Sequence, residues 1–169
     1  GRMLWLKADT ISLSNNTAVT TWQDNSLCGN HMVATGSPIF KTNMFNGKPI
    51  VQLTGAGDYF SMANTLSYNS YTIFGVGTHL SMRVLFLGGT GSEFFGFSDG
   101  GPTCTILHRA FDDSGITFGA YPYTASTKFL LTSVVTNGNA VVYLNGTQVT
   151  SQSINSTTWK NVGRRDGYA

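Results

Sequence analysis

The segment LLTSVVTNGNAVVYLNGTQVT, from Leu130 to Thr150, decides the fold. Three runs rich in valine, threonine and other β-forming residues are separated by Asn137-Gly138 and Asn145-Gly146. Asn-Gly readily takes the positive φ angles that two-residue hairpin turns require. The runs themselves have the composition of strands. The segment therefore predicts a three-stranded antiparallel meander.

The same pattern extends over the rest of the chain. Apolar residues recur with period two, or in short runs of Val, Ile, Phe, Tyr and Thr, and the breaks fall at Gly, Asn and Asp. No convincing helix is present, and 17–30 is expected to be a loop with at most one helical turn. The alternation places Trp5, Phe74 and Phe97 on buried faces. The expected strands are Met3–Lys7, Pro49–Leu53, Tyr59–Ser61, Tyr71–Thr78, Arg83–Gly88, Glu93–Ser98, Thr103–His108, Ile116–Ala120, Lys128–Thr136, Ala140–Asn145 and Thr147–Ser151. Such a set indicates an all-β sandwich or barrel.

Length and charge limit the classes of function. A chain of 169 residues makes one domain, 1–169, that can bury a core without disulfides. Charged residues make up 11% of the chain, and no basic block is longer than Arg164-Arg165, so we expect no nucleic-acid partner. No apolar run approaches the roughly 18 residues of a membrane span. Cys28 and Cys104 leave two alternatives open, one bridge or two free thiols.

Five motifs follow one another along the chain: LWLKAD (4–9), WQDNS with GN (22–30), NGKPIVQLTGAGDYF (46–60), VVYLNG (141–146) and VGRR (162–165). Their order resembles laminin-G-like domains of the concanavalin A-like lectin/glucanase superfamily. The resemblance covers nearly the whole chain and implies a jelly roll of two antiparallel sheets.

In such domains a further strand follows the last motif and pairs beside the first strand. This chain stops at Ala169. The resemblance therefore leads us to expect a two-sheet sandwich that lacks its final strand and is a fragment of a larger protein. A protein partner or a missing segment would then occupy the open sheet edge.

The segment from Trp22 to Val33 is dense in polar and turn-forming side chains. The resemblance implies an ordered turn in which Asp24 and Ser26 bond backbone amides. Trp22 would then belong to the core. A catalytic or metal site is the alternative, and we favour the structural interpretation.

The acidic residues argue against glycoside hydrolysis. Retaining glycosidases need two carboxylates about 5 Å apart, and this chain has one glutamate, Glu93. Asp112 and Asp113 are adjacent, so in a strand they would point to opposite faces. We therefore predict that the protein is not an enzyme. No zinc-binding spacing occurs, and no cofactor is expected. Calcium stays open, because Asp99, Asp112, Asp113 and Asp166 are loop candidates for its oxygen ligands.

A sugar site is the favoured alternative to catalysis. Carbohydrate sites combine an aromatic platform with amides and hydroxyls. Tyr121 and Tyr123 flank Pro122, which we expect in a loop because proline cannot donate to a central ladder. The alternative is that both tyrosines cap the core edge and that Trp159 packs over the end of the sandwich. The predicted ligand-binding residues are Tyr121, Tyr123, Asp112, Asp113 and Trp159.

The sequence thus favours a noncatalytic module that binds a glycan or another cell-surface ligand, within a larger extracellular or particle-surface protein. The alternative is a structural domain of a bacteriophage capsid, tail or fibre that acts through protein contacts. Either function would place the domain outside the cell, on a cell surface or on a virion surface.

Overall fold

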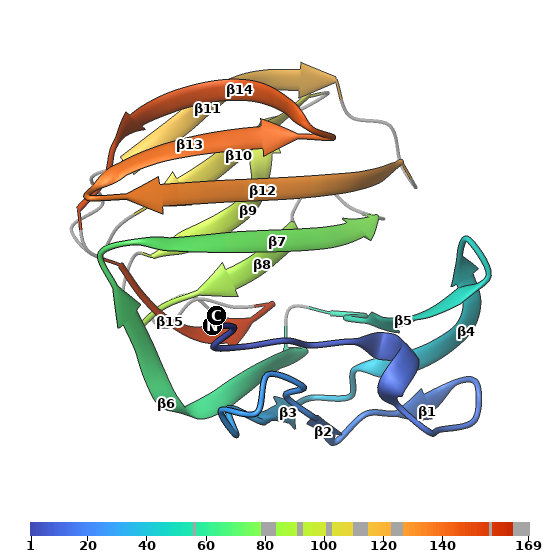
Figure 1. The fold of residues 1–169 in the computed structure, drawn as a ribbon. Helices are drawn as coiled ribbons and strands as arrows, with labels where there is room; N and C mark the ends of the chain where they lie inside the picture. The colour runs from blue at the N-terminus through green and yellow to red at the C-terminus, as the bar shows by residue number, and fades with distance from the viewer. Residues whose placement is uncertain are drawn as a thin grey trace.

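A computed structural model describes residues 1–55, 57–78, 84–90, 93–100, 103–109, 115–122, 127–155 and 157–163. Nearly all regular structure in this part is antiparallel β, and the only helix in it is a short 3₁₀ turn, η1 (Ala8–Thr10). Two sheets face each other as a jelly-roll sandwich, and a smaller third sheet adjoins them (Figure 1). The predicted all-β fold class is confirmed.

The front sheet contains the predicted meander. Asn137 and Gly138 have φ angles of 49° and 75°, and Asn145 and Gly146 have 52° and 82°, as the Asn-Gly turns require. The strand order is β14-β13-β12-β7, and every neighbouring pair is antiparallel. The strands are β7 (Tyr71–Thr78), β12 (Lys128–Thr136), β13 (Asn139–Leu144) and β14 (Thr147–Ser153).

Substituting Gly146 tests how strongly the second turn depends on its backbone. A Cβ at Gly146 meets nothing within 4 Å, so the cost of Gly146→Ala comes from the positive φ alone. We expect a loss of about 1 kcal/mol in the free energy of unfolding by urea denaturation. Gly55→Ala is the matched control, because its Cβ also meets nothing and its φ is not positive. An equal loss in both variants would contradict this account.

In the view of Figure 1 the back sheet extends further down than the front sheet. In Figure 1 the front sheet stands before β8 to β11, and β6 runs down to the remaining strands. The order is β11-β10-β9-β8-β15-β6-β3-β2, and the third sheet has the order β1-β4-β5. The strands are β1 (Thr17–Ala18), β2 (Thr21–Trp22), β3 (Met32–Thr35), β4 (Ile39–Phe45), β5 (Lys48–Gln52), β6 (Tyr59–Tyr68), β8 (Val84–Gly88), β9 (Phe94–Gly100), β10 (Thr103–Arg109), β11 (Gly115–Pro122) and β15 (Thr157–Val162).

Two clusters of buried residues form the core. The larger cluster lies between the two sheets, and the smaller cluster is formed mainly by residues of β3, β4 and β6. Leu66 of β6 packs against both. The larger cluster contains Ile73, Phe95, Phe97, Ile106, Phe129, Leu131, Val135, Ala140, Val142, Ile154 and Trp159. The smaller contains Val19, Met32, Phe40, Phe60 and Met62.

Three predictions about the strands were wrong. The segment Met3–Lys7 is not a strand, because its one pairing is an isolated bridge between Leu6 and Asp24. The segment 17–30 holds β1 and β2 instead of a helical turn. Phe74 is 62% exposed, because an alternating pattern separates two faces without showing which one is covered. Trp5 lies outside any strand and is 37% exposed.

Cys28 is an exposed free thiol, so it forms no bridge to Cys104. In the part of the chain described above, no helix is long and apolar enough to cross a membrane.

Candidate functional site

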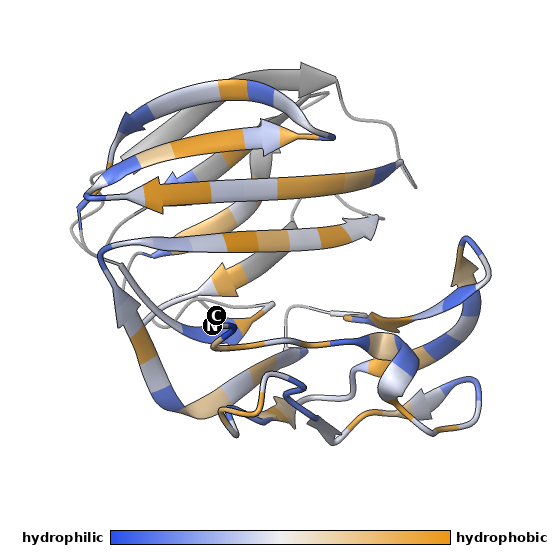
Figure 2. Ribbon diagram, in the orientation of Figure 1, coloured by the Kyte–Doolittle hydropathy of each residue, from blue (hydrophilic) through white to orange (hydrophobic). Residues whose placement is uncertain are grey.

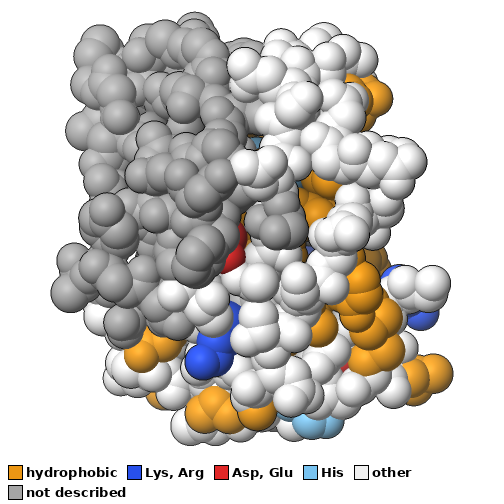
Figure 3. All heavy atoms as spheres, turned by 90° about the vertical axis from the view of Figure 1, so that its left-hand side faces the viewer, with side chains coloured by type: hydrophobic (Ala, Val, Ile, Leu, Met, Phe, Trp, Pro, Cys, Tyr) orange, Lys and Arg blue, Asp and Glu red, His pale blue; other side chains and the backbone are white. Residues whose placement is uncertain are grey.

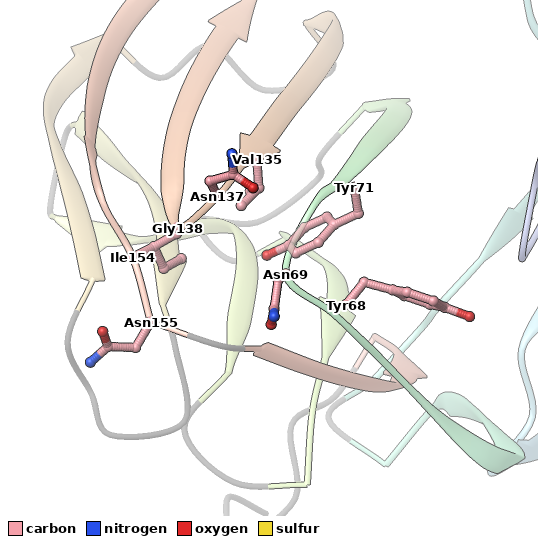
Figure 4. A pocket seen from close by; sticks show the side chains of 8 residues that line it. All are labelled: Tyr68, Asn69, Tyr71, Val135, Asn137, Gly138, Ile154 and Asn155. Atoms are coloured by element: carbon pink, nitrogen blue, oxygen red, sulfur yellow. The ribbon is translucent and has the colours of Figure 1, made fainter.

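A cleft of about 310 Å³ opens at one end of the sandwich. Figure 4 shows its lining side chains, which come from chain turns far apart in the sequence. The lining residues are Tyr68, Asn69, Tyr71, Val135, Asn137, Gly138, Ile154 and Asn155. This volume lies at the lower end of the range for small-ligand sites.

Hydrogen bonds between the turns hold the cleft together. The Asn137 N–H donates to Ser70 Oγ at 3.1 Å, which ties the β12–β13 turn to the β6–β7 turn. The Ile154 N–H donates to the Gly138 carbonyl at 2.8 Å, which ties the end of β14 to the same turn. Three separate segments therefore converge on one rigid rim.

The lining is polar but uncharged. Asn69, Asn137 and Asn155 are exposed, and each amide side chain offers two donors and an acceptor. Val135 and Ile154 are buried and supply an apolar base. Figure 3 shows the end of the sandwich on which the cleft lies, where few of the described side chains are charged. Such a surface suits a neutral ligand that is rich in hydroxyl groups.

A buried hydrogen-bond chain lies behind Tyr71. The Thr157 hydroxyl donates to Tyr71 Oη at 2.6 Å, and Tyr71 Oη lies 3.0 Å from His108 Nε2. On the other side of the ring, His108 Nδ1 lies 2.8 Å from Ser133 Oγ. Tyr71 accepts from Thr157, so its own proton is free to go to His108 Nε2, and the imidazole then donates from Nδ1 to Ser133.

Burial determines the protonation states of His108 and Tyr71 in this hydrogen-bond chain. Desolvation lowers the pKa of His108 to about 3, so the imidazole is neutral at ordinary pH. Burial likewise raises the pKa of Tyr71 to about 12. His108 and Ser133 are fully buried, and the rings of Phe95 and Trp159 pack 5.4 and 5.7 Å from the imidazole. No substrate reaches Ser133, so Ser133 and His108 do not act as a nucleophilic pair. The hydrogen bonds instead orient Tyr71.

The structure places the end of β11, where Tyr121 lies, away from the cleft. Tyr121 and Pro122 belong to β11, an edge strand, and pair with Cys104 and Thr103 instead of lying in a loop. Proline is tolerated there because an edge strand needs fewer donors. The end of β11 and the start of β12 lie at the right of Figure 1, opposite the cleft.

Trp159 is wrong as a ligand platform, because it is 4% exposed and belongs to the larger core cluster. Its packing there matches the alternative that its ring covers the sandwich interior. Asp112, Asp113, Tyr123 and Asp166 lie outside the described residues, as do the side chains of Tyr121 and Asp99. Among the side chains that are described, no three His, Cys, Asp or Glu residues gather as metal ligands.

The cleft itself was not predicted from sequence. Asn69, Asn137 and Asn155 each read as an ordinary turn residue. The sequence carried one signal for the cleft, an asparagine at or next to each of three turns. Asn69 follows a tyrosine, and Asn155 follows an apolar strand end. The sequence does not show that these turns lie close together in the fold.

The segment from Trp22 to Val33 is an ordered turn built on Asp24. This buried carboxylate accepts hydrogen bonds from the Trp5, Ser26 and Asn30 N–H groups at 2.8, 2.9 and 3.0 Å and from Ser26 Oγ at 2.6 Å. Burial raises the pKa of Asp24, but these four bonds outweigh it and hold the pKa below its ordinary value. Trp22 is half-buried against Phe60, with ring centroids 5.5 Å apart. The predicted turn, with Asp24 and Ser26 bonding backbone amides, is confirmed.

No protein-family model and no curated protein matches the sequence. Among solved structures, the binding domain of Paraclostridial Mosquitocidal Protein 1 is similar with a TM-score of 0.60 and 10% identity, over 87% of this chain and 42% of that one. An alginate lyase from Corynebacterium sp. has a TM-score of 0.45 and 18% identity, over 86% and 68%. A Bacillus licheniformis β-glucanase has 0.41 and 12%, over 96% and 80%.

The likeness to the toxin binding domain shows a shared fold and nothing more, and the chain spans about two fifths of that structure's length. The other two TM-scores lie below 0.5 and carry no weight. The molecule is thus an antiparallel jelly-roll sandwich with a small, neutral cleft at one end. Membership of the laminin-G-like branch stays a prediction.

Proposed function

We propose that this domain is a noncatalytic module that binds a neutral glycan in the cleft between the β6–β7 turn, the β12–β13 turn and the end of β14. The observation that carries the proposal is the uncharged rim of Asn69, Asn137 and Asn155 over an apolar base. Amide side chains pair with sugar hydroxyls in both directions, and the absence of charge in the lining disfavours anionic ligands. The likeness to a toxin binding domain is consistent with this role.

Substitutions at the rim test the site. Asn137→Gly removes the amide and keeps the positive φ that the turn needs, so the fold is retained. Combined with Asn155→Ala, it should weaken glycan binding by about tenfold to 100-fold, because two polar contacts to the ligand are lost. The measurement is a glycan array followed by calorimetric titration of the best neutral oligosaccharide.

Asn64→Ala is the matched control, because Asn64 is an exposed asparagine of β6 outside the cleft. It should bind like the wild type. Tyr121→Ala with Tyr123→Ala tests the site predicted from sequence. If only that variant loses binding, the glycan site lies at those tyrosines. If no neutral glycan binds at millimolar concentration, the protein is not a glycan-binding module.

A structural role through protein contacts, as in a virion, is the second candidate. One observation favours it: the outer face of the front sheet exposes Phe74 and Val76 of β7 beside Leu130 of β12. Figure 2 shows hydrophobic residues along both strands. Exposed apolar patches on a soluble domain commonly mark contact surfaces.

A further inference from the structure

Most sheet edges in the described part of the molecule are protected. β1 and β2 have two residues each, and β5 contains Lys48 and Pro49. β11 ends at Pro122 and has an irregular register with β10, and β14 has an irregular register with β13 and lies against β11. Short length, charge, proline and bulges are the devices by which natural sheets prevent edge pairing.

β7 has none of these devices. Its eight residues pair with β12 without a register shift, from Tyr71 opposite Val135 to Thr78 opposite Lys128. The strand contains no charged residue and no proline. Among the described residues it forms a ladder with β12 alone, and it is the last strand of the front sheet (Figure 1). Its second edge therefore presents a row of free amides and carbonyls.

The side chains beside this edge are also unusual. Phe74 and Val76 are 62% and 63% exposed on the outer face, and they alternate with the buried Ile73. Val76 lies opposite Leu130 on β12, so the apolar stripe spans β12 and β7 and reaches the open edge. The Thr78 hydroxyl, at the end of the strand, is buried without a hydrogen-bond partner.

We propose that the second edge of β7 is a strand-addition site that takes an extended, uncharged polypeptide segment as a fifth strand of the front sheet. Only an extended backbone satisfies alternating amides and carbonyls at the spacing of a ladder. Phe74 and Val76 select apolar or β-branched side chains on the outer face of the added strand, because a charge there would lie against an apolar surface. The edge begins at Tyr71, which also lines the cleft, but Phe74 and Val76 are not lining residues, and strand addition beside them gives the second candidate function a definite mode of contact.

A peptide probe tests the proposal. The probe is a fluorescently labelled, uncharged peptide of sequence FLLTSVVT with blocked ends, which copies residues 129–136 of the strand that already pairs with β7 on its other edge. We expect saturable binding by fluorescence anisotropy and slower hydrogen exchange of the β7 amides. A probe with proline at alternate positions should not bind, because it lacks the donors of a ladder.

Variants of the protein locate the binding. Val76→Lys places a charge on the open edge and should weaken probe binding at least about tenfold. Val33→Lys is the control, because Val33 of β3 is similarly exposed at 59%, and it should bind like the wild type. Circular dichroism checks that both variants fold.

Three outcomes would overturn the proposal: no probe binding at millimolar concentration, equal binding of the proline probe, or equal binding by Val76→Lys. A dimer seen by sedimentation and abolished by Val76→Lys would also overturn it, in favour of a second copy as the occupant. None of these results bears on glycan binding, which is measured with the rim variants.

Discussion

Lowering the pH from 7 to 5 is expected to reduce the free energy of unfolding by about 2 kcal/mol, because His108 takes up a proton only when the domain unfolds. Burial holds the pKa of His108 at about 3 in the folded state, whereas an exposed histidine titrates near 6.5. Below pH 6.5 the unfolded chain therefore binds one more proton than the folded chain. Stability falls with pH down to about 3, where the folded state is protonated as well.

The pH window separates this effect from those of the carboxylates. Hydrogen bonds outweigh burial and lower the pKa of Asp24, and the same holds for Asp58, which accepts from Thr54 and Ser37. The stability that these two groups contribute is lost only below about pH 4, where an unfolded aspartate becomes protonated. Urea denaturation at pH 7, 6 and 5 therefore reports mainly on histidine.

A double variant assigns the effect to His108. His108→Phe with Ser133→Ala removes the titrating imidazole and the hydroxyl beside its Nδ1. Tyr71 Oη loses its contact with His108 Nε2 but keeps the hydrogen bond from Thr157. Its free energy of unfolding should change little between pH 7 and 5. A slope that persists in the double variant would show that another group is responsible.

Removing the Asp24 carboxylate should cost about 3 kcal/mol of stability. Asp24→Ala deletes the acceptor of four hydrogen bonds and leaves the buried Asn30 N–H without its partner. Hydrogen bonds to a charged acceptor contribute more than neutral ones, and an unpaired buried donor carries a desolvation penalty. The measurement is the urea midpoint at pH 7 together with hydrogen exchange of the Trp5 and Asn30 amides.

Two further variants calibrate this result. Asp24→Asn keeps the shape but turns a donor toward at least one of the existing donors, so it should lose about half as much stability. Asp9→Ala removes an exposed ion pair with Lys7, whose charged atoms are 3.4 Å apart, and should cost well under 1 kcal/mol. An effect of Asp24→Ala no larger than that of Asp9→Ala would mean that the turn does not depend on the carboxylate.

Sequence predicted the features that local chemistry determines. The Asn-Gly turns were found because their residues favour the required φ angles wherever they occur. β7 and β12 were predicted with the bounds that they have in the structure. Met3–Lys7 has the composition of a strand, yet a strand also needs a partner along its length, and composition does not show that one is present. β4 was missed because Lys41, Thr42 and Asn43 interrupt its apolar pattern.

Contacts between segments far apart in the chain could not be predicted from the sequence. Asn69, Asn137 and Asn155 meet only because two hairpin turns and a strand end share one end of the sandwich. Trp159 was a candidate platform, although packing over the end of the sandwich was the favoured interpretation, because an indole has an apolar body and one polar atom. The exposure of Phe74 depends on what covers the sheet, which is not encoded within β7 itself.

The position of β6 decides how the molecule responds to force. Its first half pairs with β3, and residues at both of its ends pair with β15, so one strand is hydrogen-bonded to the parts of the structure that contain both buried clusters. A load applied to residues near the N-terminus therefore reaches the sandwich through the β3–β6 ladder before it reaches the cleft. If the domain is tethered at that end, the β3–β6 ladder lies in the path of the load.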